Sequence, residues 1–223
     1  MAVEIGFLNT NSYLTGLNPA ELDSIRKLIF EKAAERGKLV LFEGDSAEVL
    51  YWVVSGVVKV FKTSADGKEQ ILRLVRPGES FNDVPVFSGG SNLASAEAIM
   101  PVVLYGIKKS DVEVILKSYP QLTPNVIRVL SQRVEHLVSL VEDLSFRHVT
   151  NRVAKILLEH AGGGSGQGTR LTQQEMAAMA GTARETVGRS LKSLEADGMI
   201  RMDHHRIIIT NKKALGEMTA VAP

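Results

Sequence analysis

The chain of 223 residues has no cysteine, and aromatic residues make up only 5% of it. The absence of cysteine excludes disulfide bonds, thiolate nucleophiles and cysteine-bound iron–sulfur clusters. Long apolar runs are also missing: the longest, residues 98–107, contains Pro101, whereas a membrane helix needs ~18 apolar residues or more. The N-terminus lacks the basic and apolar regions of a signal peptide. We therefore expect a cytoplasmic protein without membrane contact.

The sequence also lacks the residue sets of common catalytic and metal sites. We find no Ser/His/Asp or Cys/His arrangement, no metal-ligand spacing and no phosphate-loop lysine. The glycine-rich run of residues 162–168 follows no strand, and we interpret it as a flexible connector. We expect no enzyme, no catalytic residue, no metal site and no cofactor, while an unknown small-molecule effector stays open.

The charged residues are unevenly distributed along the chain. Hydrophobic residues make up 44%, which allows a sizeable core in one large or two modest domains. The formal net charge is +1, but residues 1–145 carry 15 Lys/Arg against 18 Asp/Glu, and residues 146–223 carry 11 against 7. A basic C-terminal part favours contact of that part with a polyanion.

Two capping-box spacings lie ten residues apart in this basic part: Thr172 with Glu175, and Thr182 with Glu185. In such a box the hydroxyl accepts a backbone N–H three residues on, and the carboxylate reaches back to the cap. Gly181 between the boxes can turn the chain at positive φ. The pattern predicts two helices joined by a short turn, a helix-turn-helix.

The second of these helices has two contrasting faces. The apolar residues recur at helical spacing and should face inward: Val187, Leu191 and Leu194. The opposite face carries Arg184, Gly188 and Lys192, flanked by Glu185 and Arg189. Arginine can donate two parallel hydrogen bonds to guanine and glutamate can accept from cytosine, so this face suits a DNA major groove. The alternative is a solvated face with a Glu185–Arg189 ion pair worth about 0.3–0.5 kcal/mol.

Residues 184–189, Arg-Glu-Thr-Val-Gly-Arg, resemble the recognition helix of the catabolite-activator/fumarate-nitrate regulator (Crp–Fnr) family. The resemblance implies a homodimeric transcription regulator that reads TGTGA-type half-sites in double-stranded DNA, with RNA polymerase as a partner. It implies Arg184, Glu185 and Arg189 as the base readers. For the DNA backbone, the expected contacts are Thr172, Gln173, Thr182 and Lys192, with Arg201, His204, His205 and Arg206 as further candidates.

The N-terminal part changes from a helical to a β pattern. Residues 18–34 predict a helix capped by Asn18. Short β-rich runs between turn residues follow, as is typical of an antiparallel barrel or sandwich: 39–42, 49–54, 57–62, 70–74, 94–99 and 102–107. Phrases such as Phe42-Glu43-Gly44-Asp45 resemble the cyclic-nucleotide-binding jelly roll of the same family. The expected fold class is α+β: a jelly-roll sensor domain (1–124), a dimerisation helix (125–145) and a winged helix-turn-helix domain (146–223).

The pocket of such a jelly roll would lie in residues 77–98, where the sequence departs from the family pattern. The cyclic-AMP binders have Gly-Glu for the ribose and Arg-Ser for the phosphate, and these align with Asn82-Asp83 and Leu93-Ala94. The expected pocket is therefore degenerate: Gly78, Glu79, Asn82, Asp83, Leu93 and Ala94. Leucine cannot neutralise a phosphate, and burial of an unpaired charge is costly, so we expect that cyclic AMP does not bind.

Other effectors stay open. Arg73 and Arg76 could serve another anion, although we expect them to be partnered residues at the surface or a strand edge, paired with Glu69 or Glu79. Haem would need an axial ligand, and the barrel region has no histidine; we expect His136, on the following helix, at a surface or interface. The alternatives are a different small molecule or an effector-independent regulator.

Residues 125–144 have a period of 3.5. The heptad positions carry β-branched residues at a and leucine at d: Ile127, Leu130, Val134, Leu137, Val141 and Leu144. This choice favours a parallel two-stranded coiled coil. A second strip, Val126, Val129 and Leu140, suits packing on the barrel.

After this helix we predict a hinge at 145–150, a helix with Val149, Val153, Ile156 and His160, and a hairpin of 199–202 with 206–210 that completes a winged domain. A remote alternative for the whole chain is a barrel module that regulates a partner protein through its C-terminal domain.

Overall fold

The computed structural model describes residues 3–161, 171–203 and 206–220; the glycine-rich run and the pair His204-His205 lie outside these ranges. The chain divides into two compact units, Met1–Lys62 with Leu72–His136, and Thr63–Ile71 with Leu137–Pro223. The boundaries at 124 and 145 stay predictions. In the part of the chain that is described, no helix is both long and apolar enough to span a membrane.

The first unit begins with two short helices, α1 (Ile5–Asn9) and α2 (Pro19–Arg26). Asn18 caps α2 as predicted, in a capping box with Glu21. The predicted helix over 18–34 is wrong beyond Arg26, because Ile29–Ala34 forms strand β1. This strand pairs with β8 through six registered residues, from Ile29 opposite Ile107 to Ala34 opposite Val102. Strand pairing outweighs the helical spacing of the apolar residues here.

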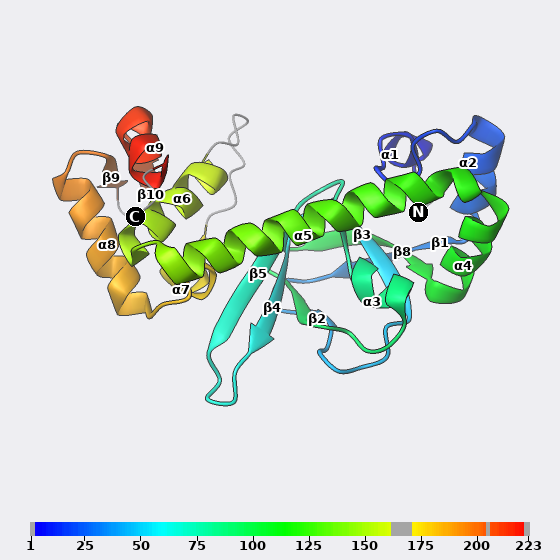
Figure 1. Cartoon of the computed structure of the whole chain (residues 1–223), viewed down its shortest axis with the longest axis horizontal. Coiled ribbons are helices and arrows are strands. Elements are labelled where there is room, and N and C mark those ends of the chain that lie inside the picture. Colours follow the sequence, from blue (N-terminus) through cyan, green and yellow to red (C-terminus); the bar gives the residue numbers. More distant parts are fainter. Residues whose placement is uncertain (1–2, 162–170, 204–205, 221–223) are drawn as a thin grey trace. The chain divides into compact units, whose positions relative to one another are not determined.

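Two four-stranded antiparallel sheets form the barrel, with strand orders β1-β8-β3-β6 and β2-β7-β4-β5 (Figure 1). Their remaining strands are β2 (Leu39–Leu41), β3 (Val49–Ser55), β4 (Val58–Thr63), β5 (Glu69–Val75), β6 (Ser80–Phe81), β7 (Ser95–Ala98) and β8 (Val102–Lys108). The six predicted strands are confirmed, and β1 and β6 were not predicted. Side chains between the sheets form a closed apolar core that includes Val53, Val58, Val75 and Leu104.

Gly106 of β8 shows why a glycine can be required inside a strand. It is in register with Phe30 of β1 and with Tyr51 of β3. A Cβ at this position would lie 2.4 Å from Cζ of Phe30. Only glycine leaves room for the two rings to meet edge to face, with their centroids 6.3 Å apart.

Four helical segments complete the first unit and lead out of it: α3 (Asp83–Ser88), α4 (Lys109–Ser118), the 3₁₀ turn η1 (Pro120–Leu122) and α5 (Thr123–Phe146). The long helix predicted over 125–144 is confirmed as α5, the unbroken green helix of Figure 1. Val129, with Val126 beside it, packs in a core with Leu122 and residues of α2, β3 and α4. Val126 and Val129 of the second apolar strip therefore pack on the barrel unit as expected, whereas Leu140 is not part of this core.

The second unit is a small helical domain with a hairpin: α6 (Val149–Ala161), α7 (Gln173–Ala180), α8 (Arg184–Ala196), β9 (Ile200–Asp203), β10 (Arg206–Ile209) and α9 (Lys212–Ala220). Helix α6 packs against α7, α8 and α9 around a core that includes Val153, Leu191 and Leu215. The break between α5 and α6 falls inside the predicted hinge. The helix-turn-helix and the hairpin are confirmed, and α9 was not predicted.

Candidate functional site

The helix-turn-helix is held by one of the two predicted capping boxes. Thr172 caps α7: its hydroxyl accepts from the Glu175 N–H at 3.1 Å, and the Glu175 carboxylate accepts from the Thr172 N–H at 2.6 Å. Gly181 ends α7 at φ 62°, the left-handed conformation expected of it. The second box is wrong, because α8 begins at Arg184 with Ala183 as its cap and without a side-chain capping bond. Thr182 instead belongs to the turn, where its N–H donates to the Ala177 carbonyl at 3.0 Å.

Helix α8 separates its buried and exposed residues as predicted. Val187, Leu191 and Leu194 are fully buried, while Arg184, Glu185 and Arg189 are exposed. The alternative ion pair between Glu185 and Arg189 is not formed in the described structure; Arg189 Nη2 instead donates to Thr186 Oγ1 at 3.1 Å. The exposed face therefore presents guanidinium donors and a carboxylate acceptor to solvent.

The residues expected at a DNA backbone lie around this face. Thr172 at the start of α7 and Lys192 on α8 are exposed, and Gln173 and Thr182 are half-buried. Arg201 and Arg206, one on each strand of the hairpin, are exposed as well. Gly188 keeps the surface of α8 low, since an added Cβ would meet only Gln173 Oε1, at 3.8 Å. The roles of these residues stay predictions.

A charged cluster that the sequence reasoning missed joins the end of α5 to α6. The Asp143 carboxylate forms ion pairs with Lys155 Nζ at 2.5 Å and with Arg147 Nε at 2.7 Å. The second contact lacks hydrogen-bond geometry and is purely electrostatic. Arg152 donates to the backbone carbonyls of Asp143, at 3.3 Å, and Arg147, at 2.7 Å. The i, i+4 spacing of Asp143 and Arg147 was a signal that could have revealed part of this cluster.

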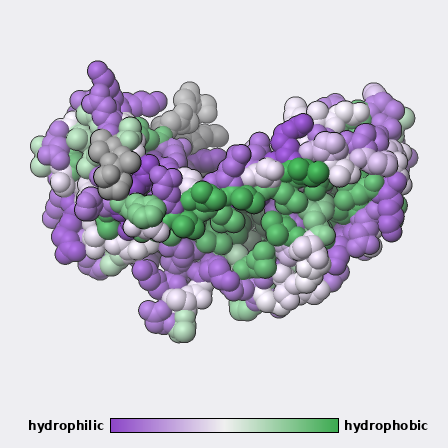
Figure 2. Space-filling model, in the orientation of Figure 1, coloured by the Kyte–Doolittle hydropathy of each residue, from purple (hydrophilic) through white to green (hydrophobic). Residues whose placement is uncertain are grey.

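The apolar strip predicted for the dimer is uncovered in the single chain. Its members Ile127, Val134 and Val141 are each about 60% exposed, and Leu137 and Leu144 are exposed too. Leu130 is half-buried. Figure 2 shows hydrophobic surface along the line of α5. A surface of this kind usually marks an interface.

The six residues of the predicted effector pocket are spread over different environments. Gly78 turns the chain at φ 90°, and the Glu79 carboxylate accepts from the Arg76 N–H at 2.6 Å. Asn82 has φ 64°, the only positive value of a non-glycine residue in the described ranges. Leu93 is 58% exposed and Ala94 is buried. Of these six residues, only Asp83 presents a buried charge to the barrel.

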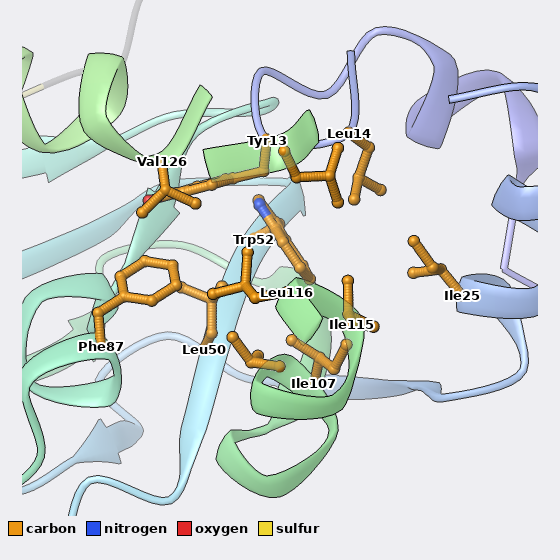
Figure 3. A pocket seen from close by; sticks show the side chains of 12 residues that line it. Tyr13, Leu14, Ile25, Leu50, Trp52, Phe87, Ile107, Ile115, Leu116 and Val126 are labelled. Carbon is orange, nitrogen blue, oxygen red and sulfur yellow. The ribbon is translucent and has the colours of Figure 1, made fainter. Parts of the chain in front are cut away.

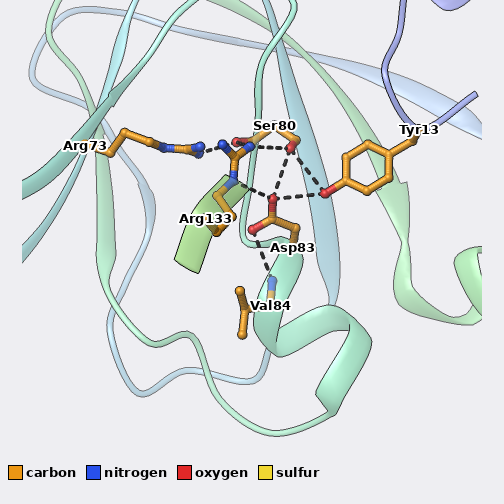
Figure 4. A network of polar contacts seen from close by, with 6 residues as sticks. All are labelled: Tyr13, Arg73, Ser80, Asp83, Val84 and Arg133. Carbon is orange, nitrogen blue, oxygen red and sulfur yellow. Dashed lines mark hydrogen bonds and ion pairs between the residues drawn. The ribbon is translucent and has the colours of Figure 1, made fainter. Parts of the chain in front are cut away.

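Asp83 is 5% exposed and accepts four hydrogen bonds (Figure 4). Its Oδ2 accepts from Tyr13 Oη at 3.0 Å, Ser80 Oγ at 3.1 Å and Arg133 Nε at 3.1 Å. Its Oδ1 accepts from the Val84 N–H at 3.1 Å. Burial, and then the Asp83 charge, raises the pKa of Tyr13 well above its ordinary value, so the phenol stays a donor. The carboxylate is thus held in place by four donors of the protein itself.

Arg73 is partnered and lies on β5, an edge strand of its sheet, but its guanidinium is buried and not at the surface. It lies between the buried residues Ile71 and Val75 at the alternate positions of β5, so its side chain points into the barrel. Its Nη2 donates to the Ser80 carbonyl. The alternation of Ile71, Arg73 and Val75 was the sequence signal for this burial.

A separate apolar cavity of about 30 Å³ lies beside this network (Figure 3). Its walls include Tyr13, Trp52, Phe87, Ile107, Ile115 and Val126. Ligand pockets usually measure roughly 300–1,000 Å³, so this cavity is a packing gap with room for about one water molecule. His136, the histidine considered for haem, places Nε2 2.9 Å from the Leu72 carbonyl oxygen.

Known proteins resemble this chain over both units. Two family descriptions match: a cyclic nucleotide-binding domain over residues 31–119 and a Crp-like helix-turn-helix domain over residues 151–218. The chain is 32% identical over 203 residues to the cyclic AMP receptor protein of Thermus thermophilus. This match covers 91% of this chain and 94% of the relative. It is 29% identical over 218 residues to the global nitrogen regulator of Synechococcus elongatus, with 94% and 97% covered. The solved structure of FixK2 from Bradyrhizobium japonicum matches with a TM-score of 0.78 at 26% identity, covering 87% and 99%.

Proposed function

Because this chain belongs to the Crp–Fnr family of DNA-binding transcription regulators, we propose that it acts as a homodimer on an inverted repeat of TGTGA-like half-sites. The observation that carries the proposal is the division of α8, with Val187, Leu191 and Leu194 buried and the polar face exposed. A helix that packs one face into the core of its domain can place its opposite face in a major groove.

Arg184, Glu185 and Arg189 are the proposed base readers. The two arginines would each donate a pair of hydrogen bonds to guanine O6 and N7, and Glu185 would accept from cytosine N4. Thr172, Gln173, Thr182 and Lys192 would hold the register through the phosphates. Each bidentate contact contributes roughly 1–3 kcal/mol of discrimination against a wrong base.

The proposed dimer pairs two copies of α5 through Ile127, Leu130, Val134, Leu137, Val141 and Leu144. Their exposure in the single chain leaves an apolar strip in water, and the heptad pattern suits a parallel pair. Two recognition helices then meet two half-sites about one helical turn, roughly 34–36 Å, apart.

The experiment is a fluorescence anisotropy titration with a TGTGA-N6-TCACA duplex and a scrambled duplex of equal composition. Arg184→Ala and Arg189→Ala should each weaken specific binding about 5- to 150-fold, which corresponds to roughly 1–3 kcal/mol, and should leave the scrambled duplex nearly unaffected. Arg36→Ala, an exposed arginine in the first unit, is the matched control for loss of one charge. Equal losses on both duplexes would assign the arginines to phosphates and refute base reading.

We also propose that the barrel does not take cyclic AMP, although the name of the Thermus relative states that ligand. Leu93 stands where the family has its phosphate-binding arginine, and the Asp83 carboxylate is already engaged by Tyr13, Ser80 and Arg133. Isothermal titration of cyclic AMP into the full chain should give no saturable heat. Micromolar binding would contradict this part of the proposal.

The remaining parts of the proposal follow from the family. RNA polymerase is the proposed protein partner, and the cytoplasm is the proposed location because that is where a bacterial chromosome is read. The alternative to a sensor is an effector-independent regulator. The chain offers no observation that favours an enzymatic role.

A further inference from the structure

Two guanidinium groups converge on one carbonyl oxygen inside the barrel. Arg73 of β5 and Arg133 of α5 both donate from Nη2 to the Ser80 carbonyl, the second at 3.2 Å (Figure 4). Arg133 Nη2 also donates to Ser80 Oγ at 3.0 Å. Like charges repel at this separation unless an anion lies between or beside them.

Two carboxylates lie near these charges, but neither accepts a hydrogen bond from Arg73 in the described structure. Asp83 pairs with Arg133 directly. Glu79 is close enough to act on Arg73 electrostatically, and its Oε2 accepts from the Arg76 N–H. Arg73 Nη1 is buried and has no hydrogen-bond partner among the described residues. Burial, followed by the Arg133 charge, lowers the pKa of Arg73 to about 10, and Asp83 and Glu79 only partly oppose this.

A buried donor without a partner costs stability, and a buried unpaired cation costs more. Two positioned guanidinium groups are well suited to an oxyanion, because each presents parallel N–H donors that match carboxylate and phosphate oxygens. Arg73 reaches this place only because it occupies an inward position between Ile71 and Val75. Arg73 thus places an unused donor inside a barrel that lacks the phosphate-binding arginine of its family.

We propose that Arg73 and Arg133 bind the oxyanion group, carboxylate or phosphate, of a small acid inside the barrel. The inference names the ligand class of the regulator proposed above and depends on that proposal only for its biological use. Arg73 Nη1 supplies the unused donor. The ligand would accept from this donor and link β5 to α5, the helix that carries the dimer strip.

The test uses the full chain and two probes, inorganic phosphate and malonate, which separate the two sources of an oxyanion. Thermal unfolding is followed while each probe replaces potassium chloride at constant ionic strength. Binding gives a rise of the melting temperature of several degrees, which grows with the logarithm of ligand concentration above Kd. Equilibrium dialysis of the stronger probe should then give about one anion per chain.

Variants separate this site from general salt stabilisation, which phosphate also produces. Arg73→Met should abolish the rise of the melting temperature that the probe causes. Arg73→Gln, which keeps a polar side chain, should abolish it as well and replaces the first variant if that variant folds poorly. Arg36→Met removes an exposed arginine and should keep the full response. A response to either probe that needs Arg73 supports the inference and identifies the oxyanion.

Two results would overturn the inference. One is a rise of equal size in wild type, Arg73→Met and Arg73→Gln, which assigns it to the bulk effect of the salt. The other is a melting temperature that does not rise with the concentration of either probe. DNA titrations run in parallel distinguish this failure from that of the proposed function: intact sequence-specific binding with no anion response refutes the anion site alone.

Discussion

Arg73 is the residue whose placement changes the interpretation of the barrel most, and it makes a stability prediction. Its guanidinium is buried with one nitrogen unpartnered, while Asp83 and Arg133 remain paired without it. Replacing such a buried cation with an apolar side chain is often stabilising. Arg73→Met should therefore raise the free energy of unfolding by about 1–2 kcal/mol at pH 7, measured by urea denaturation. The exposed Arg36→Met should change it by less than about 0.5 kcal/mol.

The pH dependence of this gain has a definite sign. Burial and Arg133 lower the pKa of Arg73 from its ordinary value to about 10 in the folded chain. Between these values the unfolded chain binds more protons, so wild-type stability gains from this group as pH rises. The advantage of Arg73→Met should be constant below pH 9 and shrink above pH 10. An advantage that grows above pH 10 would contradict the assigned burial.

At the scale of one element, a substitution at Gly188 of α8 should change stability and DNA affinity in opposite directions. Glycine in a helix interior costs roughly 0.5–1 kcal/mol relative to alanine, and a Cβ at Gly188 would meet nothing closer than 3.8 Å. Gly188→Ala should therefore stabilise the chain by about 0.5–1 kcal/mol. The added methyl group would protrude from the face of α8 that we propose to lie against the bases. Specific DNA affinity should therefore fall about tenfold.

The control for this prediction is Gly216→Ala in α9, where an added Cβ meets nothing within 4 Å. It should give a similar gain in stability, measured by thermal unfolding, and leave the anisotropy titration unchanged. If both variants lower DNA affinity equally, the face of α8 around Gly188 is not at the groove.

Most elements could be predicted from the sequence because local patterns determine them. The heptads of α5, the Asn18 and Thr172 capping boxes and the left-handed Gly181 depend on residues within a few positions of each other. Strand β1 could not, because Ile29–Ala34 becomes a strand through pairing with β8, about seventy positions away. The second capping box failed for a related reason: the turn at Gly181 moves the start of α8 past Thr182.

The candidate sites divide in the same way. The two faces of α8 follow from helical spacing, and the structure confirms which residues are buried. The polar network of the barrel combines Tyr13 of the N-terminal segment, Asp83 of α3 and Arg133 of α5. No local pattern brings these three residues together. The inward position of Arg73 was readable from its alternation with Ile71 and Val75, but the contacts that it makes there were not.

At the scale of the whole molecule, the apolar strip of α5 makes the last prediction. Val134 and Val141 occupy successive a positions and are each more than half exposed in the single chain. Introducing two carboxylates with Val134→Glu and Val141→Glu would place like charges opposite each other in a parallel pair. Sedimentation equilibrium should then give the 24.3 kDa single chain, where the wild type gives twice that mass.

The same double variant should weaken binding to the inverted repeat by about 10²- to 10⁴-fold, because linked recognition helices gain that much from simultaneous contact. Binding to an isolated half-site should hardly change, since α8 keeps its own core. Gln132→Glu adds a carboxylate to an exposed position of α5 outside the strip and should preserve both dimer and affinity. A double variant that remains dimeric would place the interface elsewhere and remove the reason for two half-sites one turn apart.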